Sequence, residues 1–204
     1  GSNTVIPQIA AQALGLPLSD FSYIGPDTAS SPDAGETSAS RQTFVSGRAA
    51  QAAGSALRAR LLRLVNAGEG AKLSLNGQTV TVSEGTARHE IHLAALPVDA
   101  RGYALSVEET YDPPTRPLDE NGQGSPYALY GYGAQMVELA VDTRLGTVHL
   151  LKITAAHDVG RAINPQLIEG QIEGGIAQGI GMALMEEYLA GRTDNLHDYL
   201  IGVR

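Results

Sequence analysis

Gln171 is the side chain whose surroundings point most directly to ligand chemistry. Its amide offers two donors and an acceptor in one plane, which suits the edge of a heterocycle or a phosphate. The residues around it include Gly170, Gly174, Gly175, Gly179 and Gly181. Each glycine costs roughly 1 kcal/mol relative to alanine inside a helix, so this stretch must gain something from close approach. We expect a flat ligand or a neighbouring helix beside Gln171.

A second candidate site is residues 36–42, which read ETSASRQ and precede a predicted long helix. Free N–H groups and the helix dipole at such a start can hold an anion, so a phosphate would fit. The alternative is plain capping of the helix by Ser38 or Ser40. Two candidate binders in one small acidic chain favour the ligand interpretation.

Two groups that contain histidine are weaker candidates for a metal or catalytic site. His89 and His92 are three apart rather than the four of H-E-x-x-H, and no third ligand is evident, so a solvated helix face is expected. His157 and Asp158 are expected in a tight turn, and no nucleophile elbow supports Ser/His/Asp catalysis. We therefore assign no catalytic residue and no metal ligand to this chain.

The glycine-rich stretch is predicted to be a helix that begins at Asn164, a good N-cap, with Pro165 at its first position. Gly191 is its expected C-cap. Apolar residues recur at every fourth position and predict a core face: Ile168, Ile172, Ile176, Ile180 and Leu184. The segment is too polar for a membrane span, and its glycines lie too deep in the helix for a dinucleotide fingerprint.

The remaining pattern predicts an α+β fold with two long helices on mixed or antiparallel sheets. Further helices are expected at residues 4–14, 41–66 and 88–96. Strands are expected at 21–24, 72–75, 78–82, 103–110, 135–142 and 148–155, with loops at 25–36 and 112–125. The strand pairs form hairpins about Asn76-Gly77, as a type I′ turn, and about Leu145-Gly146.

Composition limits the partners. A net charge of −8 and a pI near 5.0 argue against nucleic acid and anionic membranes, so an anionic cofactor must be held by backbone dipoles. The absence of cysteine excludes disulfides, thiolate metal sites and iron–sulfur clusters. The chain begins without Met and shows no signal peptide, so we expect a processed, tagged or partial chain, with a cytoplasmic location and the periplasm as the alternative.

Four segments resemble one known family. Residues 158–187, DVGRAINPQLIEGQIEGGIAQGIGMALMEE, resemble the pterin-binding helix of the xanthine dehydrogenase and aldehyde oxidase family of molybdenum hydroxylases. Residues 32–53 resemble its second pterin-contacting loop and helix, and residues 1–17 the segment after its G-Q-G motif. Residues 111–148 are similar to its bacterial large subunits of the aldehyde-oxidising type. The resemblance covers nearly the whole chain.

The resemblance implies that residues 1–204 are the second molybdopterin-binding domain of such a subunit, in part. It implies that Gln171 bonds the pterin, that the loop backbone holds the cofactor near the metal, and that Gly1 ends the G-Q-G motif. The implied cofactor-binding residues are Gly1, Ala39, Ser40, Arg41, Gln42 and Gln171. The family's catalytic glutamate lies downstream of the helix in a G-x-G-E segment, which this chain lacks.

The implied reaction is hydroxylation of an aldehyde or an N-heterocycle, with water as the oxygen source. The implied cofactor is molybdopterin with molybdenum, in its plain or cytosine dinucleotide form. The implied partners are the first molybdopterin-binding domain, an iron–sulfur subunit or domain and an FAD subunit. The isolated chain is expected to be inactive. A different hypothesis is a non-catalytic domain that binds no cofactor by itself.

Overall fold

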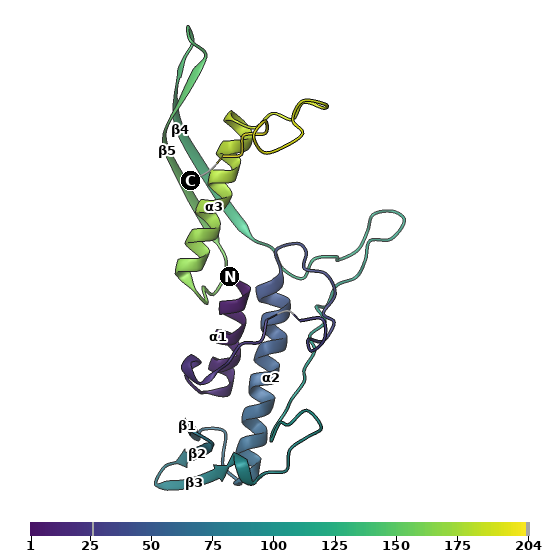
Figure 1. Cartoon of the computed structure of the whole chain (residues 1–204), viewed down its shortest axis with the longest axis vertical. Helices are drawn as coiled ribbons and strands as arrows, with labels where there is room; N and C mark the ends of the chain where they lie inside the picture. The colour runs from purple at the N-terminus through teal and green to yellow at the C-terminus, as the bar shows by residue number, and fades with distance from the viewer. Residues whose placement is uncertain (26, 203–204) are drawn as a thin grey trace. The chain divides into compact units, whose positions relative to one another are not determined.

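The computed structural model describes residues 1–25 and 27–202. The chain divides into two compact units, residues 1–128 and 129–204, which are described separately (Figure 1). The first contains α1 Ser2–Leu14, α2 Gln42–Leu64, β1 Lys72–Asn76, β2 Thr79–Glu84, β3 Ala87–His92 and the short 3-10 helices Leu18–Asp20 and Leu93–Ala95. The second contains β4 Tyr132–Asp142, β5 Thr147–Asp158 and α3 Pro165–Leu184. Helices combined with antiparallel sheets confirm the α+β class.

Two buried glycines let α1 pack closely on α2. A Cβ atom on Gly54 would lie 2.6 Å from the carbonyl oxygen of Ala10 and 2.8 Å from Cβ of Ala13. A Cβ atom on Gly47 would lie 2.8 Å from Cδ1 of Ile9. Residue numbers rise together along this contact, so the helices run parallel and both begin at the same end of the first unit (Figure 1).

The core of the first unit lies where the last turns of α2 meet a three-stranded antiparallel sheet of order β1-β2-β3. Val82, in the central strand, is fully buried. The other buried members are Leu14, Leu61, Leu62, Ala71, Leu73, Val80 and Ile91. Burial of these aliphatic side chains is the main favourable term that holds helix and sheet together.

The first hairpin forms as predicted, but its turn is shifted by one residue. Asn76 pairs with Thr79, so the loop residues are Gly77 and Gln78. Gly77 has φ +57° and Gln78 does not have a positive φ. Type I′ turns need a positive φ at both central residues, whereas type II′ needs it only at the first. The type I′ assignment is therefore wrong.

Three element predictions in this unit are also wrong. Residues 88–96 form β3 and a 3-10 turn instead of a helix, because Ile91 pairs with Val80 and enters the core. Residues 21–24 and 103–110 lack a strand partner among the described residues and are irregular. A strand needs a partner for its N–H and C=O groups, and neither segment has one among the described residues.

In the second unit, β4 and β5 form an antiparallel ribbon that extends beyond the predicted bounds and has an irregularity after Glu138. Three pairs place aliphatic side chains on one face: Val137 with Ile153, Leu139 with Leu150, and Val141 with Val148. Five of these six side chains are between 37% and 52% exposed. The sixth, Ile153, is half-buried. The ribbon therefore presents an apolar face that nothing in the described chain fully covers.

α3 begins as predicted, because the side chain of Asn164 accepts a hydrogen bond from the N–H of Leu167 at 3.1 Å. Its isoleucines are half-buried and Leu184 is exposed, so the predicted core face is only partly covered. The helix ends at Leu184 rather than at Gly191, because the chain that follows folds back onto Gly181. No helix in the described part of the chain is long and apolar enough to cross a membrane.

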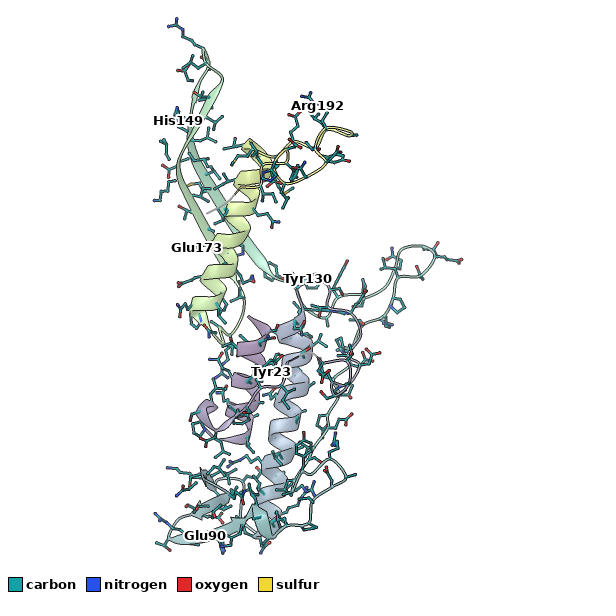
Figure 2. The ribbon with its side chains drawn as sticks, viewed as in Figure 1. Tyr23, Glu90, Tyr130, His149, Glu173 and Arg192 are labelled. Carbon is teal, nitrogen blue, oxygen red and sulfur yellow. The ribbon has the colours of Figure 1, made fainter. Side chains whose placement is uncertain are left out.

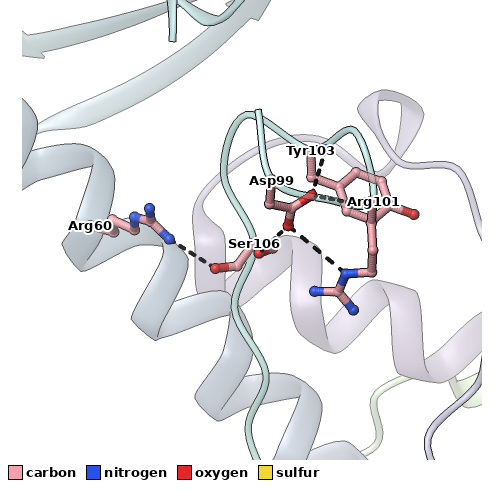
Figure 3. Close-up of polar contacts among 5 residues, drawn as sticks. All are labelled: Arg60, Asp99, Arg101, Tyr103 and Ser106. Atoms are coloured by element: carbon pink, nitrogen blue, oxygen red, sulfur yellow. Dashed lines mark hydrogen bonds and ion pairs between the residues drawn. The ribbon is translucent and has the colours of Figure 1, made fainter. Parts of the chain in front are cut away.

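Asp99 organises the loop that follows the sheet (Figure 3). Its carboxylate accepts hydrogen bonds from the N–H groups of Arg101 and Tyr103, each at 2.9 Å, and from Oγ of Ser106 at 3.0 Å. Arg60 of α2 donates to the carbonyl oxygen of Ser106 at 2.9 Å, which ties the loop to the helix. The bond from the Tyr103 N–H is the main cause that lowers the pKa of Asp99.

The helix contact predicts that Gly54→Ala destabilises the chain by about 1–3 kcal/mol, because the new methyl group overlaps backbone atoms of α1. Gly175→Ala on α3 is the matched control, since no atom lies within 4 Å of its Cβ position. Urea unfolding curves measure both. Equal stability of the two variants would show that α1 and α2 do not pack at Gly54.

The lowered pKa of Asp99 predicts an acid-dependent loss of stability. The charged carboxylate is favoured in the folded state, so its contribution is present above the unfolded pKa of about 3.9 and lost as pH falls through the folded pKa. Asp99→Asn should flatten the stability profile between about pH 5 and pH 2. Asp112→Asn, at an exposed position, is the control. Identical profiles for wild type and Asp99→Asn would contradict this role.

Candidate functional site

The loop before α2 has an unusual backbone. Ala39 and Ser40 have φ values of 54° and 51°, in the left-handed region that costs an L-residue roughly 1–2 kcal/mol. Arg41 follows at φ −103° and ψ 7°. A left-handed residue followed by one near the right-handed helical region turns successive N–H groups toward one side, which forms an anion-binding concavity. The N–H of Arg41 donates to the carbonyl oxygen of Ser38 at 3.4 Å, so the N–H groups of Ala39 and Ser40 are the ones that suit the anion site predicted at this loop.

The start of α2 is also free of side-chain capping. Arg41 is the N-cap residue, and its side chain makes no capping hydrogen bond. The capping alternative for Ser38 and Ser40 is wrong, because Arg41 occupies the N-cap position and Ser40 before it has a left-handed backbone. Gln42 is held from the side, since Oγ1 of Thr37 donates to its Oε1 at 2.9 Å. The first N–H groups of α2 are therefore available to an anion.

The parallel helices bring Gly1 to the same end of the first unit as this loop. The carbonyl oxygen of Gly1 accepts from the N–H groups of Thr4 and Val5 at 3.0 Å and so begins α1. At 1.5 Å per residue, Gly1 lies roughly 12 Å beyond Ile9, and Arg41 roughly 9 Å beyond Gly47. Five of the six predicted cofactor-binding residues, all but Gln171, thus lie at one end of the helix pair.

Gln171 lies in the second unit, on α3. Its side chain is exposed, and no residue of the described chain bonds its amide. The Cβ positions of Gly174 and Gly175 have no atom within 4 Å, so no other backbone of the described chain approaches them. Figure 2 labels Glu173 on the same helix, two residues after Gln171. The convergence of Gln171 with the loop of the first unit stays a prediction.

The histidine clusters lie on strands. His89 and His92 are in β3, where residues three apart point to opposite faces, so the expected helix face is wrong. Within the described residues, no group of three or more His, Asp or Glu could hold a metal ion. His157 and Asp158 end β5, and Asp158 Oδ1 accepts from the N–H of Gly160 at 2.9 Å, as the predicted turn requires.

A shallow hollow of about 410 Å³ lies elsewhere in the first unit, lined in part by Gln12, Gly15, Arg58 and Lys72. Its Arg58 guanidinium bonds the carbonyl oxygens of Leu14, Glu69 and Ala71. These bonds join the end of α1 to the chain that enters the sheet. We interpret Arg58 as a structural tie, so the hollow carries no functional argument.

Comparison with known proteins identifies one family for the chain. Residues 1–202 match the molybdopterin cofactor-binding domain family. The chain belongs to this family. It is 32% identical over 218 residues to the xanthine dehydrogenase molybdenum-binding subunit of Escherichia coli O157:H7, an alignment that covers 98% of this chain and 27% of that subunit.

Two eukaryotic relatives extend this family assignment. Xanthine dehydrogenase of Oryza sativa subsp. japonica is 28% identical, covering 98% of this chain and 13% of that enzyme. Aldehyde oxidase 2 of Mus musculus is 30% identical, covering 93% of this chain and 13% of that enzyme. The chain thus spans about a quarter of the bacterial subunit and less of the plant and mouse enzymes. The residues present fit an anionic cofactor, because the N–H groups of Ala39 and Ser40 and those of the first turn of α2 lack a side-chain cap, while the N–H of Arg41 donates to Ser38.

The strained loop predicts that Ser40→Gly stabilises the chain by about 1 kcal/mol, because glycine adopts a positive φ without steric cost and keeps the N–H. Ser38→Gly, in the same loop but without a positive φ, is the control and should lower stability by a similar amount. Thermal unfolding of the wild type, Ser40→Gly and Ser38→Gly measures their differences in stability. Equal destabilisation by both substitutions would contradict the left-handed loop.

Proposed function

We propose that this chain forms one wall of the molybdenum cofactor site in a hydroxylase that oxidises aldehydes to carboxylic acids with water as the oxygen source. The observation that carries this proposal is the uncapped start of α2 behind two left-handed residues, at the same end as the start of α1. When bound, the cofactor supplies the two-electron oxidation of the substrate carbon. The protein supplies binding, orientation and exclusion of water.

Each predicted residue has a specific role in this proposal. The N–H groups of residues 39–42 hold an anionic oxygen of the cofactor, with Gly1 beside them. The Gln171 amide recognises the hydrogen-bonding edge of the pterin, and the bare backbone at Gly174 and Gly175 lets a flat ring approach. We assign no general base to this chain, and the base is expected in the segment that follows the glycine helix in the family.

The proposed partners follow from the apolar surface that the second unit leaves exposed. The exposed apolar face of the ribbon and the half-buried isoleucines of α3 favour packing against further protein, because a two-stranded ribbon alone is marginally stable in water. We propose that the chain is the second of two molybdopterin-binding domains, next to the first. Iron–sulfur and flavin partners receive the electrons, and the cofactor is the plain or the cytosine dinucleotide form. A cytoplasmic location remains a prediction.

Aldehydes are the proposed substrates because residues 111–148 resemble the aldehyde-oxidising type. A second candidate is hydroxylation of an N-heterocycle, which is favoured by the relatives named xanthine dehydrogenase. Turnover of benzaldehyde and of a purine by the assembled enzyme distinguishes these substrates. We expect no turnover by the chain alone. Activity of the isolated chain that disappears in Glu36→Gln would place the base in this chain and contradict the proposal.

Cofactor content tests the proposal directly. The chain, co-expressed with its proposed partner domain in a host that makes the cofactor, should contain molybdenum and pterin. Gln171→Leu should reduce both by about tenfold, since a hydrogen bond to a ligand is worth about 1–1.5 kcal/mol. Gln178→Leu, two turns along the same helix, is the matched control. A wild-type complex without pterin would support the non-catalytic alternative.

A further inference from the structure

The second unit contains a close crossing of two glycine backbones, at Gly181 and Gly202. Among its described residues, Gly181 of α3 is the only one that is buried. A Cβ atom on Gly181 would lie 2.8 Å from both N and Cα of Gly202. A Cβ atom on Gly202 would lie 2.5 Å from Cα of Gly181 and 3.3 Å from the carbonyl oxygen of Ala177. Neither position has room for a side chain unless the two segments separate.

One carboxylate holds this crossing together. Oε2 of Glu186 accepts a hydrogen bond from the Tyr199 hydroxyl at 2.9 Å, and Oε1 accepts from the N–H of Gly202 at 3.4 Å. The same Oε1 lies 2.6 Å from the Cβ position of Gly181. The bond to Glu186 is also the main cause that raises the pKa of Tyr199. We name these four residues, Gly181, Glu186, Tyr199 and Gly202, the Glu186 latch.

The latch sets the direction of the returning chain. Tyr199 meets Glu186 beyond the end of α3, while Gly202 meets Gly181 and Ala177 inside the helix, so residues 199–202 run antiparallel to α3. Ala177 lies one turn nearer to Gln171 than Gly181 does. Gly174 and Gly170 continue the same face at helical spacing, and no atom lies within 4 Å of their Cβ positions. Up to Gly202, the described chain therefore runs along α3 in the direction of Gln171.

We propose that Glu186 is a positioning residue that directs the chain after α3 back toward the cofactor-binding half of this helix. This inference rests on the function proposed above. A carboxylate that bonds one hydroxyl and one backbone N–H fixes the segment at two points, and the glycine crossing allows backbone contact without a spacer. Glu186 acts through the segment that it holds and not on the substrate.

Hydrogen exchange tests the latch in the chain without any cofactor. Glu186→Ala should speed exchange of the Gly202 amide by about tenfold or more, because bonds to a charged acceptor are the stronger class. Glu186→Gln keeps one acceptor oxygen and should show a smaller change. Glu187→Ala is the matched control from the next position. Gly181→Ala should also speed exchange, whereas Gly179→Ala, which meets no atom within 4 Å, should not.

Kinetics of the cofactor-loaded enzyme distinguish a positioning role of Glu186 from a role in protein stability alone. For Glu186→Ala we expect kcat per bound molybdenum to fall by about tenfold or more with KM nearly unchanged, and Glu186→Gln to rescue part of the loss. Unchanged kcat per bound molybdenum, or unchanged Gly202 exchange, would overturn the proposal. A wild-type enzyme without cofactor would instead contradict the proposed function, and the exchange result would still decide whether the latch exists.

Discussion

The parallel contact between α1 and α2 is the interaction on which the first unit depends. Two parallel helices point the positive ends of their dipoles the same way, which is unfavourable unless an anion or solvent compensates. Close approach at Gly47 and Gly54 maintains this arrangement through backbone contact. The result is a concentration of free N–H groups at one end of the pair, where Gly1 and the loop at residues 39–42 lie. Packing deep in the helix pair therefore creates the candidate anion site.

The two units differ in how much of their apolar surface they bury through their own contacts. The first has a continuous aliphatic core between α2 and its sheet. The second has an exposed amphipathic ribbon and a helix with a bare glycine face, and among its described residues only Gly181 is buried. Hydrophobic burial is the dominant favourable term in folding, so the second unit gains less from its own contacts. This difference agrees with a chain that spans about a quarter of its bacterial relative.

Local rules are broken at the places proposed to bind the cofactor. Ala39 and Ser40 occupy a backbone region that suits glycine, while α3 carries glycines where alanine would make a better helix. Sequences are locally consistent except where function requires otherwise, so both departures support the proposed roles. The strained loop orients N–H groups, and the bare helix leaves space for a flat ring. Gly181 is an exception with a visible structural cause, because it contacts Gly202.

The sequence by itself determined those features that depend on nearby residues. The start of α3 at Asn164 and Pro165 and both hairpins were predictable, because caps and turn pairs act within a few residues. The family was also evident from motifs. The position of the candidate anion site at this loop could be predicted from the sequence. The conformation of the loop could not, because Ser38 and Ser40 were also suitable N-cap residues for the helix.

Tertiary structure decided what depends on distant partners. Residues 88–92 form a strand because Ile91 pairs with Val80 and packs in the core. α3 ends at Leu184, and the chain that follows returns to contact Gly181 through Gly202. The parallel helix pair could not be inferred from Gly47 and Gly54 alone, although their seven-residue spacing was a signal for a close helix contact. A local pattern records what a residue can do, whereas free energy of burial depends on which distant surface it meets.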